Sequence, residues 1–116
     1  MKRAYVTMLC GGDAYVPGIE ALGQSLIQTG TQVPLVVMVT PEVPAAARQS
    51  LAARGFILRD IEPIKNPRPD CELLYPRFAL TYSKLRAFEL TEYDKVVWLD
   101  ADTVVLRNID ELFARP

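Results

Sequence analysis

At 116 residues, half of them apolar and 23% charged, the chain is long enough for one domain with a buried core. Its formal net charge of −1 leaves no basic excess to neutralise phosphates, so it offers no electrostatic case for binding nucleic acid. No stretch reaches the roughly 20 apolar residues of a membrane span, and the two cysteines, Cys10 and Cys71, are too few for a disulfide framework. We therefore expect a cytoplasmic protein with reduced thiols and no membrane span.

The N-terminal residues predict a strand followed by a helix. Residues 5–9 are a short apolar run that ends at a glycine turn, which is typical of a buried strand. Over residues 14–29 apolar side chains recur at three- and four-residue spacing, and this pattern predicts an amphipathic helix. Asp13 is placed to cap the start of that helix and Gly30 to close its end.

The middle of the chain predicts a second strand and helix, then a short third strand. Leu35–Val39 is a continuous apolar run, typical of a strand covered on both faces. An alanine-rich stretch at residues 45–54 predicts a helix that Gly55 stops, and residues 56–58 predict a strand. Residues 61–76 are rich in proline and therefore predict a loop.

The C-terminal part predicts a helix, a buried strand and a last helix. The helix is expected over residues 77–90, and the strand over residues 95–99, which lead into Asp100-Ala101-Asp102. Asn108 and Glu111 resemble a capping box for a helix that begins at Ile109. Because strands and helices alternate, we expect an α/β fold: a Rossmann-like, open, mainly parallel sheet with helices on both faces.

Two candidate sites follow predicted strands, at the ends where open parallel sheets bind ligands. The segment Cys10-Gly11-Gly12-Asp13 follows the first strand, but it lacks a third glycine for the dinucleotide-binding fingerprint. Asp100 and Asp102 follow the last strand, where extended backbone would point both carboxylates toward one Mg²⁺ or Mn²⁺ ion. The small Ala101 between them would let a ligand approach the backbone. Aspartates are also common turn formers after strands, so this pair alone supports either interpretation.

Arg77 and Lys84 form a further candidate site on the predicted third helix. Residues seven positions apart differ by only about 20° around a helix axis, so these two cations share a face, with Thr81 between them. A cationic face suits a diphosphate, because charge-assisted bonds to phosphate stabilise a leaving nucleotide. Periodicity alone nevertheless favours an ordinary solvated helix flank.

Several segments in order carry a resemblance to a known family. They lie at residues 4–15, 21–26, 77–85, 90–103 and 108–113, so the resemblance covers nearly the whole chain. Together they resemble family 8 of the glycosyltransferases, the group that contains glycogenin and galactinol synthase. The resemblance implies a truncated fold of the glycosyltransferase A type, in which residues 1–116 are a single nucleotide-sugar-binding, N-terminal portion.

The resemblance also implies a reaction and a set of binding residues. The reaction is transfer of a hexose from a UDP-sugar to an acceptor hydroxyl, with retention at the anomeric carbon, and the acceptor is unknown. Asp100 and Asp102 match the ligands of Mn²⁺ (or Mg²⁺). The residues that match donor-binding positions are Met8, Cys10, Gly11, Tyr15, Arg77, Lys84, Asp100, Ala101 and Asp102.

The chain departs from the family pattern in one respect. The family completes its metal site with a histidine from a later motif, and this chain has no histidine. The acceptor-binding half is also expected beyond Pro116. We therefore expect these residues alone to bind UDP with Mn²⁺ weakly and to transfer sugar poorly or not at all.

Two other functions fit parts of the sequence. Haloacid-dehalogenase-type phosphatases place a similar acidic pair after an apolar strand, with the first aspartate, here Asp100, as nucleophile. That motif normally begins its fold, whereas about 100 residues precede it here. The second alternative is a non-catalytic domain that binds a nucleotide or a partner chain. Its open sheet edge and apolar surface would favour a homo-oligomer.

Overall fold

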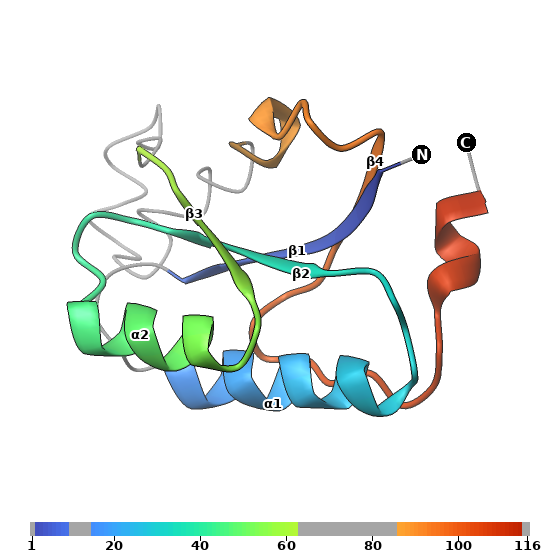
Figure 1. Cartoon of the computed structure of the whole chain (residues 1–116), viewed down its shortest axis with the longest axis horizontal. Coiled ribbons are helices and arrows are strands. Elements are labelled where there is room, and N and C mark those ends of the chain that lie inside the picture. The colour runs from blue at the N-terminus through green and yellow to red at the C-terminus, as the bar shows by residue number, and fades with distance from the viewer. Residues whose placement is uncertain (1, 10–14, 63–85, 115–116) are drawn as a thin grey trace, which may run out of the picture.

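The computed structural model describes residues 2–9, 15–62 and 86–114. Within these ranges, four parallel strands form one sheet in the order β3-β2-β1-β4 (Figure 1). The strands are β1 Arg3–Leu9, β2 Leu35–Val39, β3 Ile57–Asp60 and β4 Lys95–Trp98. The helices are α1 Val16–Gln28, α2 Ala45–Ala53 and the 3-10 helix η3 Asp110–Ala114. The predicted open, parallel α/β sheet is confirmed.

β1 and β2 form the centre of the described sheet, and side chains cover both of its faces. All five residues of β2 are buried, as expected from its continuous apolar run. The helices α1 and α2 lie on one face, over Tyr5 and Leu9 of β1 (Figure 1). On the other face, a cluster of buried residues includes Leu90, and residues 86–89 form one turn of 3-10 helix directly before it. Alternate residues of β1 therefore enter two separate cores.

The ends of the helices follow the predictions only in part. Gly30 (φ 79°) and Gly55 (φ 91°) close α1 and α2 in the left-handed region, as predicted. The predicted cap Asp13 is wrong, because Tyr15 is the N-cap of α1 and the helix begins at Val16. Tyr15 makes no side-chain capping bond, and the start of the helix relies instead on a proline in its first turn.

A glycine allows α1 to pack closely against the residue that precedes β3. A Cβ atom built on Gly23 would lie 1.9 Å from Cζ of the buried Phe56 ring. Phe56 is buried in this core directly before β3, and the strand spans Ile57–Asp60 instead of the predicted residues 56–58. The contact fixes the distance between α1 and the chain that enters β3.

We expect Gly23→Ala to lower the free energy of unfolding by about 1–3 kcal/mol, because overpacking forces side chains and backbone to shift. The gain in helix propensity, about 1 kcal/mol for alanine over glycine, only partly offsets this cost. Urea denaturation followed by circular dichroism measures the change. A variant as stable as the wild type would contradict the predicted clash.

Four residues connect the helix η3 to β1 and to the turn after α1: Tyr5, Thr31, Asp110 and Phe113. The hydroxyl groups of Tyr5 and Thr31 both donate hydrogen bonds to the Asp110 carboxylate. The rings of Tyr5 and Phe113 meet edge to face, with centroids 5.0 Å apart. Asn108 accepts the N–H of Asp110 at 2.9 Å, so it does cap the last helix, which begins at Asp110 and not at Ile109.

Other expectations fall on the parts of the chain that are not described. Residues 63–85, with most of the predicted loop and helix there, lie outside the described residues. The last residues of that predicted helix, 86–89, form a 3-10 turn. In the described ranges, no helix combines the length and the apolar character that crossing a membrane requires.

Candidate functional site

The Asp100-Ala101-Asp102 segment forms a turn at the carboxyl end of β4. The N–H of Leu99 still donates to the carbonyl of Val6 at 2.9 Å, but the ladder ends there. The carbonyl of Asp100 then accepts both the N–H of Thr103 (3.1 Å) and its hydroxyl (2.6 Å). The premise that extended backbone aligns the two carboxylates is therefore wrong, because Ala101 and Asp102 occupy the corner of a turn.

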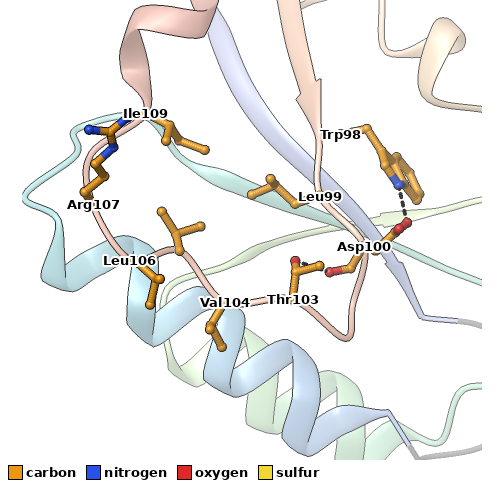
Figure 2. A pocket seen from close by; sticks show the side chains of 9 residues that line it. Trp98, Leu99, Asp100, Thr103, Val104, Leu106, Arg107 and Ile109 are labelled. Carbon is orange, nitrogen blue, oxygen red and sulfur yellow. Dashed lines mark hydrogen bonds between the residues drawn. The ribbon is translucent and has the colours of Figure 1, made fainter.

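The side chain of Asp100 is held by the residue that ends β4. The indole Nε1–H of Trp98 donates to Oδ1 of Asp100 at 2.7 Å (Figure 2). A hydrogen bond to a charged carboxylate is stronger than one between neutral groups, and such bonds fix the orientation of carboxylates that bind metals. Asp100 and Asp102 are both solvent-exposed, so a ligand can reach them.

The turn rests against the first turn of α1. A Cβ atom built on Gly18 would lie 2.7 Å from the carbonyl oxygen of Ala101, so only glycine fits there without a shift of backbone. Ala101 also packs against the main core cluster. Sequence reasoning missed Gly18; its one signal was a glycine inside a helical pattern, a choice that costs about 1 kcal/mol relative to alanine.

From the turn onward, residues 101–110 run along α1 toward the C-terminal end of that helix. The hydroxyl oxygen of Ser25 accepts the N–H of Val105 at 2.8 Å and donates to the carbonyl of Leu22 at 2.6 Å. Further along, the side-chain amide of Asn108 donates to the carbonyl of Thr29 at 3.4 Å. The 101–110 segment is therefore attached to α1 from the first helical turn to the C-cap.

An open pocket of about 440 Å³ lies between the end of β4 and the 101–110 segment (Figure 2). Asp100 and Arg107 lie at its two ends, and the side chains between them are mainly apolar. Two of these apolar side chains are unusually exposed, Val104 at 56% and Leu106 at 92%. The lining residues are Trp98, Leu99, Asp100, Thr103, Val104, Val105, Leu106, Arg107 and Ile109.

The structure brings several of the predicted donor-binding residues to the same end of the sheet. Val6 of β1 pairs with Trp98, the last residue of β4, so Met8 and Asp100 each lie two residues beyond this pair, toward the carboxyl ends of the two strands. Met8 and Trp98 pack against the same core cluster. Tyr15 is 59% exposed and precedes α1, three residues before the contact with Ala101. The other predicted residues, Cys10, Gly11, Arg77 and Lys84, lie outside the described ranges.

The donor set of the turn suits a hard divalent cation. Carboxylates are the oxygen ligands that Mg²⁺ and Mn²⁺ prefer, and such ions often combine one or two of them with water and substrate phosphates. Within residues 2–9, 15–62 and 86–114, no three His, Cys, Asp or Glu side chains gather as a complete protein site would require. By residue type, Asp100 and Asp102 are therefore candidate ligands for such an ion.

Comparison with known proteins identifies close relatives. The family model Glycosyl transferase family 8 matches residues 6–115. Galactinol synthase 3 and galactinol synthase 10 of Arabidopsis thaliana are 42% and 43% identical over 99% of this chain. Galactinol synthase 1 of Ajuga reptans is 40% identical over 99% of this chain. The chain spans only 34–35% of the length of these three relatives.

Proposed function

The chain belongs to glycosyltransferase family 8, and from that premise we propose that it is the donor-binding portion of a metal-dependent hexosyltransferase. The proposed reaction transfers a hexose from a UDP-sugar to an acceptor hydroxyl with retention at the anomeric carbon. The observation that supports it most is the turn of Asp100 and Asp102, exposed at the carboxyl end of β4 beside β1. We further propose a cytoplasmic location.

Asp100 and Asp102 would hold Mn²⁺ or Mg²⁺ against the diphosphate of the donor. When bound, such an ion offsets the negative charge that develops on the departing UDP. The indole Nε1–H of Trp98 donates to Oδ1 of Asp100 at 2.7 Å and keeps this carboxylate oriented, so the carboxylate would already be in place when the ion binds. Met8 and Tyr15 lie at the same end of the sheet and are proposed to flank the uridine. Arg77 and Lys84 are proposed to contact the diphosphate, on the family resemblance alone.

The relatives' names make galactinol the first product to look for once a donor is known. The family match over residues 6–115 favours a transferase over a phosphatase of the haloacid-dehalogenase type. A partner-binding or self-associating role is favoured by one observation, the exposed Val104 and Leu106 beside the pocket. Size-exclusion chromatography together with UDP titration separates these roles, because stable dimers without UDP binding would support the second.

Calorimetric titration of UDP with Mn²⁺ and with EDTA tests the metal site. We expect affinity for UDP to depend on Mn²⁺, and Asp100→Asn or Asp102→Asn to weaken the Mn²⁺-dependent binding by at least about tenfold, since even the partners that orient metal ligands contribute that much. Asp94→Asn is the matched control, because Asp94 lies before the opposite end of β4 and bonds the backbone N–H of Lys2. Equal binding with Mn²⁺ and with EDTA would contradict the proposal.

A further inference from the structure

Gly18 lies at the contact between the first turn of α1 and the turn that follows β4. Its position in the first turn of α1 leaves no room for a Cβ atom, which would lie 2.7 Å from the carbonyl oxygen of Ala101. The obstructing atom belongs to the backbone, so it cannot rotate aside as the end of a flexible side chain would. Ala101 is the central residue of the turn that carries Asp100 and Asp102.

The turn has little freedom to adjust on either side of this contact. Before it, Leu99 is bonded to β1 through the carbonyl of Val6 at 2.9 Å. After it, Val105 is bonded to the hydroxyl of Ser25 on α1 at 2.8 Å. A side chain at position 18 would therefore push on a short segment held at both ends, and the turn between those ends would have to yield.

We propose that Gly18 is a positioning residue, which sets where the Asp100 and Asp102 carboxylates stand relative to the start of α1. The expected effect of Gly18 on donor binding rests on the proposed function. The structural claim that Gly18 fixes the position of the turn is independent of that function. Displacing a binding group by about 1 Å is enough to cost a large part of its effect, so a single methyl group at position 18 suffices as a test.

Trp98 gives a direct readout of the turn, because it is the only tryptophan in the sequence and its indole bonds Asp100. We expect Gly18→Ala to shift the indole N–H resonance and the fluorescence maximum of Trp98. Gly23→Ala is the matched control: it is the same substitution in the same helix, but its clash is with Phe56. An unchanged indole resonance in folded Gly18→Ala would overturn the inference.

Donor binding gives the functional readout. We expect Gly18→Ala to weaken Mn²⁺-dependent UDP binding by at least about tenfold when binding is measured under conditions in which the variant is folded. Gly23→Ala should unfold more easily and yet bind UDP as the wild type does. The reverse pattern, with binding following stability in both variants, would overturn the positioning role. If the wild type itself binds no UDP, the proposed function fails, and the Trp98 resonance still decides whether Gly18 positions the turn.

Hydrogen exchange of the wild type tests the same coupling without any substitution. In the first turn of α1, the N–H of Ile19 donates to the carbonyl of Tyr15 at 3.0 Å. In the turn that carries Asp100 and Asp102, the N–H of Thr103 donates to the carbonyl of Asp100 at 3.1 Å. If Gly18 joins the two turns, both amides should open together, with protection factors within about threefold of each other. Much weaker protection of Thr103 would show a turn that moves independently and would overturn the proposal.

Discussion

Replacing Phe113 by alanine is expected to lower the free energy of unfolding by about 3–5 kcal/mol, the range for truncating a buried aromatic residue. The ring is only 3% exposed and meets Tyr5 edge to face, with centroids 5.0 Å apart. The guanidinium of Arg3 lies 5.4 Å from its centroid and adds a cation–π contact. Because domains are typically stable by 5–15 kcal/mol, this loss would be a large fraction of the total.

Leu112→Ala is the control for Phe113→Ala, since Leu112 precedes Phe113 in η3 and is 36% exposed. It should cost less than about 1 kcal/mol, as truncations at exposed positions usually do. Urea unfolding curves of both variants provide the comparison. Equal costs for the two variants would show that η3 frays without affecting the core, and that Phe113 contributes little to it.

Asp110→Asn is expected to lower the free energy of unfolding by about 2 kcal/mol, because hydrogen bonds to a charged acceptor contribute roughly 1.5–3 kcal/mol. The carboxylate accepts hydrogen bonds from Tyr5, Thr31 and the side-chain amide of Asn108. An asparagine has the same shape but only one acceptor oxygen, and its amide nitrogen would face a donor. Chemical denaturation at pH 7 measures the cost.

The same substitution should change how stability depends on pH. Burial raises the pKa of Asp110, but hydrogen bonds from Tyr5, Thr31 and Asn108 outweigh it, and the pKa is lowered overall. A carboxylate with a lowered pKa stabilises the fold fully above its unfolded pKa of about 3.9 and loses this effect as the pH falls through its folded pKa. The stability difference between wild type and Asp110→Asn should therefore shrink below about pH 4.

A double-mutant cycle with Tyr5→Phe isolates the contact between the two side chains. Burial of the Tyr5 ring, followed by its hydrogen bond to Asp110, raises the pKa of the phenol, so the hydroxyl keeps its proton at neutral pH and can donate to Asp110. We expect the two substitutions to cost less together than the sum of their separate costs, by about 1 kcal/mol. Strict additivity would mean that this hydrogen bond contributes nothing measurable.

Local patterns in the sequence were sufficient to predict the elements that depend on neighbouring residues. β2 matches its prediction residue for residue, because an unbroken apolar run describes a strand buried on both faces. Gly30 and Gly55 end their helices because a left-handed residue is needed there. The parallel order of the sheet followed from strands that alternate with helices.

The parts that sequence reasoning missed depend on residues far apart in the chain. The turn at Ala101 is shaped by its contact with Gly18, and the helix expected from Ile109 becomes a short 3-10 helix tied to Tyr5 through Asp110. Neither pairing leaves a periodic signal, since Gly18 and Ala101 are 83 positions apart (101 − 18) and Tyr5 and Asp110 are 105 apart. For the acidic pair, the residue types indicated the chemistry, but the assumption of extended backbone gave the wrong geometry.

The position of β1 in the sheet has a consequence for how the chain folds. On one side β1 pairs with β2, which follows it closely in the chain, so β1, α1, β2, α2 and β3 can assemble from residues 3–60. On the other side its partner is β4, and the contact of Lys2 with Asp94 joins residues 92 positions apart. Closing so long a loop is slow compared with local pairing. We therefore expect the β4-facing edge of β1 to stay unpaired until β4 has been synthesised. During that time this edge can pair wrongly or bind chaperones.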